Sequence, residues 1–215
     1  LFQLSGINNT DFYLGNTNFN LASGDYSSKL LQLYNGHLNT QSAYGNLLYN
    51  FNDKLSVIIG GRFEQIDQYV YFKSQIKPNG DKSYFSPIKV LPSLIAKYKL
   101  NDKQNMKFAL SNTYTLPQFK EKVRILFEDV QQTYEGNSKL YASTNYNADL
   151  SWELYPSKEE ILTVTAFGKL IQNPINEMFT NSSSGNITYA NTGKQAVVAG
   201  IELEVRKNLI VSSDE

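Results

Sequence analysis

The chain has 215 residues, of which 41% are hydrophobic and 13% aromatic, so it carries enough apolar material for a folded core. Twenty basic residues balance twenty acidic ones, which excludes a global electrostatic attraction to nucleic acid, and the absence of Cys excludes disulfides and thiolate metal sites. No run approaches the ~18 apolar residues of a membrane-spanning helix. A mean hydropathy of -0.39 is nevertheless compatible with strands that alternate between lipid and water.

The tripeptide Asn-Asp-Lys occurs twice in the chain, at the same place in two similar segments. YNFNDKLSVIIGG begins at Tyr49, and YKLNDKQNMKFAL begins at Tyr98. Asn and Asp favour tight turns, and each copy is followed by a strand-like pattern. We therefore predict the same short turn twice, separated by two strands and the connection between them.

Apolar and polar side chains alternate with a period of two after both turns and in three later segments. The clearest case is NYNADLSWELY, residues 145–155, where the ten residues 145–154 keep the alternation without a miss. Segments 161–171 and 196–209 repeat the pattern. Strict alternation of this kind indicates strands that lie between two different environments. Their length of 10 to 12 residues is about twice that of an average soluble strand.

The connections between these strands alternate in length. Short turns are expected near Asn52, Asn101, Ser157 and Asn208, whereas long polar connections are expected over residues 73–83, 116–144 and 173–185. Outer-membrane barrels alternate in this way, with short periplasmic turns and long external loops. The sequence therefore predicts an all-β fold, an antiparallel transmembrane β-barrel, present as an incomplete segment of roughly eight strands.

A barrel wall separates lipid from a water-filled lumen. The apolar face of each strand is therefore predicted to contact lipid, and the polar face to line the lumen. Phe51, Tyr98 and Trp152 precede short turns, where an interfacial aromatic girdle would lie. The residues predicted to face lipid are Val57, Ile59, Phe108, Leu110, Leu150, Trp152, Val164, Ile201 and Leu203. The residues predicted to face the lumen are Arg62, Glu64, Lys107, Asp149, Glu153, Lys169, Glu202 and Glu204.

Two other classes of protein share this alternation. A passive outer-membrane porin or adhesin barrel would show every periodic feature described so far. A soluble, secreted β-sandwich that binds carbohydrate would place the apolar face in its core, with Leu150 and Trp152 buried in protein. The strand length favours a barrel over the sandwich.

Four segments resemble the barrel of TonB-dependent outer-membrane receptors, especially those of Bacteroidetes, and they cover the chain from about Gln41 to Leu209. The segments are QSAYGNLLYNFNDKLSVIIGGRFE, VLPSLIAKYKLNDKQNMKFALSNTYTLPQF, STNYNADLSWELYPSKEEILTVTAFGKLIQNPI and TYANTGKQAVVAGIELEVRKNL. The resemblance implies energy-dependent uptake of a bulky nutrient such as a siderophore, cobalamin or a glycan. It also implies outer-membrane lipid around the barrel, a plug domain in the same full-length chain, and an inner-membrane energy-coupling protein as partners.

These observations predict three regions: residues 1–40, with an external loop and room for one strand; residues 41–209, the barrel segment; and residues 210–215, the truncated start of a further strand. The expected location is the outer membrane of a Gram-negative bacterium. We expect no cofactor and no nucleic-acid partner.

Catalysis is not expected. The sequence has one His, His37, and no Cys, and no nucleophile-elbow pattern accompanies His37. The carboxylates of Glu202 and Glu204, like those of Asp149 and Glu153, are spaced as alternate residues of a polar wall would be. The sequence therefore predicts a protein that binds and transports, and not an enzyme.

Overall fold

A computed structural model describes residues 2–13, 33–74, 77–128, 132–157, 159–181 and 185–208. Within these ranges, one short helix, α1 (Phe119–Lys122), accompanies thirteen strands. The strands are β1 (Phe2–Tyr13), β2 (Leu33–Asn50), β3 (Leu55–Lys73), β4 (Asp81–Phe85), β5 (Ile88–Asn101), β6 (Gln104–Thr115), β7 (Leu126–Glu128), β8 (Thr133–Glu135), β9 (Ser143–Leu154), β10 (Ile161–Gln172), β11 (Ile175–Phe179), β12 (Ile187–Asn191) and β13 (Gln195–Arg206).

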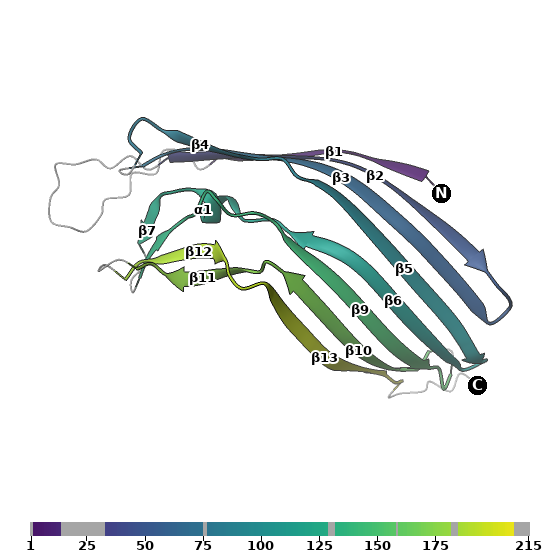
Figure 1. The fold of residues 1–215 in the computed structure, drawn as a ribbon. Coiled ribbons are helices and arrows are strands. Elements are labelled where there is room, and N and C mark those ends of the chain that lie inside the picture. Colours follow the sequence, from purple (N-terminus) through teal and green to yellow (C-terminus); the bar gives the residue numbers. More distant parts are fainter. Residues whose placement is uncertain are drawn as a thin grey trace, which may run out of the picture.

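Eight long strands form one antiparallel sheet in the order β1-β2-β3-β5-β6-β9-β10-β13, and β4 pairs with the far end of β3. Each strand on this path pairs with its neighbour along the sequence of long strands, as in an up-and-down barrel. The sheet curves into an arc, with the short turns at one end and the long connections at the other (Figure 1). The predicted fold class, an incomplete antiparallel barrel of about eight strands, is confirmed.

Both Asn-Asp-Lys tripeptides use the Asn side chain as an acceptor in a short turn, although the loops differ in length, with residues 51–54 between β2 and β3 and residues 102–103 between β5 and β6. The Asn52 side-chain oxygen accepts hydrogen bonds from the backbone N–H groups of Lys54 at 2.9 Å and Leu55 at 2.8 Å. The Asn101 side-chain oxygen accepts one from Lys103 N–H at 2.9 Å. Asn is suited to this position because its short side chain can replace a backbone acceptor in a tight turn.

A smaller sheet stands at the end of the arc where the long connections gather (Figure 1). Its order is β11-β12-β8-β7, and the pairing of β12 with β8 is parallel. The strands come from the two long connections that follow β6 and β10, so the smaller sheet joins segments that are distant in the sequence. The connection between β3 and β5 contains β4, which pairs with β3.

The buried core lies between the far half of β3 and the connection that follows β6. Val70 and Phe72 of β3 pack with Val123 and Ile125, and all four are fully or almost fully buried. Phe119 of α1 packs against this cluster, and its ring lies 2.7 Å from where a Cβ of Gly36 would stand. A side chain at Gly36 would therefore collide with α1. The connection after β6 thus folds back onto β2 and β3.

Several predicted boundaries differ from the observed ones. Strand β2 begins at Leu33 and crosses the boundary predicted at residue 41. Strand β1 pairs with β2 over residues 2–13, while residues 14–32 and the predicted strand start at 210–215 lie outside the described residues. The division of the chain into three regions stays a prediction. No helix among the described residues is long and apolar enough to cross a membrane.

Candidate functional site

The strand register divides the long sheet into two faces. The apolar face includes one row of side chains that are cross-strand neighbours over seven strands, Tyr49, Val57, Ala96, Phe108, Leu150, Ala166 and Ile201. The polar face includes the adjacent row Ser56, Lys97, Lys107, Ser151, Thr165 and Glu202. All nine residues predicted to face lipid lie on the apolar face, and all eight predicted to face the lumen lie on the polar face.

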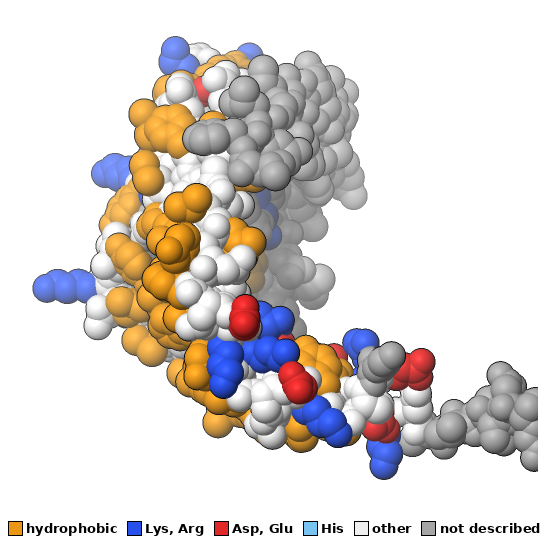
Figure 2. Space-filling view, turned by 90° about the vertical axis from the view of Figure 1, so that its right-hand side faces the viewer, with side chains coloured by type: hydrophobic (Ala, Val, Ile, Leu, Met, Phe, Trp, Pro, Cys, Tyr) orange, Lys and Arg blue, Asp and Glu red, His pale blue; other side chains and the backbone are white. Residues whose placement is uncertain are grey.

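The apolar face is not covered by protein in the described structure. Ile59, Phe108 and Leu150 belong to strands inside the sheet, yet their exposed fractions are 56%, 39% and 45%. Hydrophobic side chains gather along the convex side of the arc (Figure 2). A contiguous exposed apolar surface of this kind is typical of a face that meets lipid or another protein.

Glu64 is the centre of a hydrogen-bonded cluster on the polar face. Arg62 Nε donates to its carboxylate at 2.5 Å, and the Tyr114 hydroxyl donates to its other oxygen. Arg62 also donates to Ser42 Oγ at 2.8 Å. The Lys89 ammonium lies 6.0 Å from the centre of the Tyr114 ring. Glu64 is almost fully buried, and these donors satisfy a carboxylate that would otherwise be costly to bury.

Tyr114 departs from the expected alternation. The sequence pattern puts it on the same side as Met106 and Phe108, but its hydroxyl reaches Glu64 on the polar face. The ladder between β5 and β6 ends at Ser93 and Ser111, so β6 is free to diverge from β5 beyond that point. This divergence lets a side chain of the apolar parity reach the polar side.

A second cluster lies nearer the short turns. The Lys107 ammonium donates to Glu153 Oε1, and the Tyr155 hydroxyl donates to Glu153 Oε2 at 2.9 Å. Glu204 forms a salt bridge of 3.5 Å with the exposed Arg206. The structure therefore joins Arg62 with Glu64 and Lys107 with Glu153, but no salt bridge in the described region pairs Asp149, Lys169 or Glu202.

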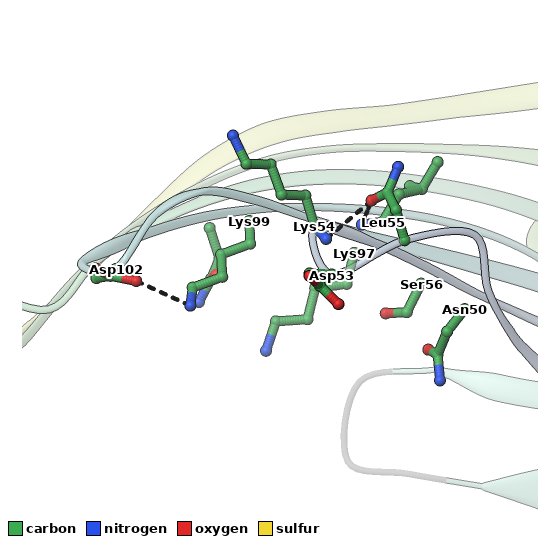
Figure 3. Close-up of a pocket in the computed structure, with 10 residues that line it drawn as sticks. Asn50, Asp53, Lys54, Leu55, Ser56, Lys97, Lys99 and Asp102 are labelled. Carbon is green, nitrogen blue, oxygen red and sulfur yellow. Dashed lines mark hydrogen bonds and ion pairs between the residues drawn. The ribbon is translucent and has the colours of Figure 1, made fainter.

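A pocket of about 630 Å³ opens between the two Asn-Asp-Lys turns (Figure 3). Asn50, Ser56, Lys97 and Asn105 line it from the polar face of the sheet, with Asp53 and Lys99 at its rim. Lys99 forms a salt bridge of 3.0 Å with Asp102. The lining is polar and carries three lysines and two aspartates, so this end of the polar face offers charged groups of both signs.

Lys122 anchors the connection that folds back onto β3. Its ammonium donates to the carbonyl oxygen of Leu140 at 2.8 Å and lies 4.9 Å from the centre of the Phe85 ring. The side chain is almost fully buried, and burial lowers the pKa of Lys122. Gln68 Nε2 donates to Pro117 O at 2.8 Å, and Ser74 Oγ donates to Arg124 O at 2.9 Å. The alternating pattern carries no signal for this anchor, because Lys122 lies in a connection between strands.

The two longest connections are bound to each other as well. Asn137 Nδ2 donates to Tyr189 O at 2.9 Å. Asn191 accepts from Tyr141 N–H at 3.1 Å and donates to Tyr141 O at 3.0 Å. Ser143 Oγ donates to Asn173 O at 2.9 Å. These hydrogen bonds join the connection after β6 to the connection after β10. The sequence predicts the two connections only as separate polar loops.

The described residues contain no cluster of three or more His, Cys, Asp or Glu side chains that could hold a metal ion. His37 lies within β2 and pairs in register with Tyr69.

Three solved structures share the fold. The siderophore receptor PirA of Pseudomonas aeruginosa is 17% identical with a TM-score of 0.53, over 84% of this chain and 41% of that one. The Serratia marcescens hemophore receptor HasR, solved with its hemophore HasA and heme, is 13% identical with a TM-score of 0.63, over 93% and 38%. The ferric yersiniabactin uptake receptor FyuA of Yersinia pestis is 18% identical with a TM-score of 0.57, over 82% and 25%.

At these identities the likeness shows the fold alone, and the chain spans between a quarter and about two-fifths of the length of these receptors. A search among curated proteins gave no match. The family described as TonB dependent receptor-like, beta-barrel matches residues 2–212, almost the whole chain. With an antiparallel curved sheet, two distinct faces and a match of that length, the chain belongs to the TonB-dependent receptor-like β-barrel family.

Proposed function

We propose that this chain forms part of the wall of an outer-membrane receptor of a Gram-negative bacterium that imports a bulky nutrient by TonB-linked transport. The observation that carries the proposal is the exposed apolar face of a curved sheet whose opposite face is polar. Lipid can cover the first face, and a solute can pass along the second. The family match supports the same reading.

The proposed partners follow from this role. Outer-membrane lipid covers the nine apolar-face residues, and the eight polar-face residues meet solvent, an interior plug domain of the full-length chain, or the solute. An inner-membrane energy-coupling protein supplies the work of transport. The nutrient is a siderophore, cobalamin or a glycan. The similar structures are receptors for a siderophore, for ferric yersiniabactin and for a hemophore, which favours a cargo that carries iron.

The other two candidate functions have less support. A soluble β-sandwich would cover its apolar face with a second layer, but Leu150 and Ile59 are exposed in the described structure. A passive porin or adhesin would fit the same sheet, yet the family match is to receptors. Chemistry is not proposed, because the family is one of transport receptors.

An immunoblot of fractionated source cells tests the proposed function. An antibody raised against residues 173–185 should detect a band in the outer membrane far larger than 24.4 kDa, whose mobility changes when the sample is boiled. A soluble band near 24.4 kDa that boiling does not change would contradict the proposal. The same immunoblot tests the predicted location in the outer membrane. It does not test the resemblance to receptors of Bacteroidetes, which stays a prediction.

A further inference from the structure

Strand β11 is an edge strand of the smaller sheet. In the part of the chain that the structure describes, it pairs with β12 on one side only. Thr192 N–H donates to Pro174 O at 2.9 Å, just before β11 begins. Because an antiparallel ladder uses the backbone groups of every second residue, those of residues 176 and 178 face β12. The backbone N–H and C=O groups that point away from the sheet are therefore those of Ile175, Glu177 and Phe179.

The side chains of β11 are as open as its edge. Phe179 is 66% exposed and Met178 is 44% exposed, although successive residues of a strand lie on opposite faces. Ile187, the cross-strand neighbour of Phe179 on β12, is only 6% exposed. The strand has one charged residue, Glu177, and no Lys or Pro of the kind that protects a free edge. A free edge with exposed apolar side chains is a template for pairing with another strand.

The open edge lies on the side where the long sheet is open too. The smaller sheet takes β7 and β8 from the connection after β6, and it takes β11 and β12 from the connection after β10. Its order therefore follows the long sheet from β6 toward β13, and β11 is the member on the β13 side (Figure 1). In a wall that continues past β13, the next long connection at this end is the segment in position to reach β11.

We propose that β11 pairs, in the full-length receptor, with an extended segment of the external connection that follows the next strand after β13. This inference rests on the proposed function, since it needs a wall that continues beyond β13. The similar receptors have length for such a wall, because more than half of each lies outside the matched region.

The added segment would satisfy the free backbone groups of β11 and cover Phe179 and Met178. The smaller sheet then becomes one stretch of a hydrogen-bonded collar around the entrance of the barrel. A collar of this kind joins successive external connections, so that they behave as one unit and not as independent loops. The inference thereby deepens the proposed function, because it names what holds the entrance together.

A photo-crosslinking phenylalanine in place of Phe179 tests the pairing in the full-length receptor in outer-membrane vesicles. We expect a crosslink within one receptor chain to a peptide at roughly residue 220 or later, because a strand of about ten residues must first lead back from the turn near Asn208. The same group at Tyr84, which is 64% exposed on β4, is the matched control and should not reach that peptide. Crosslinks between two receptors, to another protein, only to residues 1–215, or none would overturn the proposal.

A pair of substitutions at position 177 tests the backbone itself. Glu177→Pro removes an N–H that faces the open edge and leaves the bonds to β12 in place. Glu177→Ala loses the same carboxylate but keeps the N–H. The crosslink from position 179 should fall severalfold in Glu177→Pro and persist in Glu177→Ala, and equal yields would overturn the pairing. If the receptor without these substitutions is absent from the heat-modifiable outer-membrane fraction, the proposed function itself fails.

Discussion

At the scale of single residues, Glu64 is a carboxylate buried on the polar face of the sheet and stabilised by hydrogen bonds. It is almost fully buried, and two groups compensate it: the guanidinium of Arg62, which also donates to Ser42 Oγ, and the hydroxyl of Tyr114. A buried carboxylate that loses one donor retains its desolvation cost. The Tyr114 bond also bridges the point where β5 and β6 separate.

Replacing Tyr114 with Phe should therefore lower the stability of the wall. A hydrogen bond to a charged group contributes about 1.5 to 3 kcal/mol, and the phenyl ring keeps the packing. The measurement is the urea midpoint of the full-length receptor in detergent. Tyr146→Phe, on an exposed ring of the apolar face, is the control and should change the midpoint little. Equal midpoints for both variants would show that the Glu64 bond contributes nothing.

Lys122 should be the residue on which the folded connection after β6 depends most. In Lys122→Met, the carbonyl groups of Ser138 and Leu140 lose their donor, which costs about 1 to 3 kcal/mol even though the cost of burying an ammonium is relieved. Hydrogen exchange of residues 117–142 should become faster. Lys120→Met, on the exposed side of α1, serves as the control. Unchanged exchange in both variants would contradict the anchoring role.

At the scale of single elements, the turn between β2 and β3 is stabilised by the side chain of Asn52. Asn52→Ala removes the acceptor for two backbone donors, Lys54 N–H and Leu55 N–H, and should destabilise the β2–β3 hairpin by about 1 kcal/mol. Asp53→Ala in the same turn should be nearly neutral, since Asp53 is exposed. Comparison of the unfolding midpoints of the two variants is the measurement, and a larger effect at Asp53 would refute the assignment.

The two faces of β9 can be told apart by a pair of adjacent substitutions. Leu150→Arg places a charge on the apolar face, and near the middle of a bilayer this costs about 2 to 4 kcal/mol. It should block assembly in the outer membrane, while Ser151→Arg on the polar face should be tolerated. The amount of heat-modifiable receptor in isolated outer membranes is the readout. If Ser151→Arg were the more damaging change, the assignment of the faces would be reversed.

At the scale of the whole molecule, the described sheet does not close. Strands β1 and β13 each pair with a long strand on one side only. An open strand edge in lipid leaves unsatisfied backbone groups, which cost several kcal/mol each. Residues 1–215 produced alone should therefore fail to form a heat-modifiable species in detergent, whereas the full-length receptor should form one. A stable barrel of the isolated segment would show that it closes by itself.

The sequence predicted the long strands well. Strands β6, β9, β10 and β13 begin and end within three residues of the alternating segments, because each lies between two environments along its length. Strand β3 runs to Lys73, where the sequence predicts that the long connection begins. Beyond Glu64 the buried apolar residues Ile66, Val70 and Phe72 take the parity of the polar face. The alternation reverses there because the folded connection covers that part of the inner side.

The sequence by itself determined the strand class, the turns at Asn52 and Asn101, and which residues share a face, since alternation and turn chemistry are local properties. Only the tertiary structure decided how the connections pack. It also decided that Lys122 is buried and that Tyr114 reaches Glu64. These features depend on contacts between segments far apart in the sequence. A period of two along one strand carries no information about what lies beside that strand.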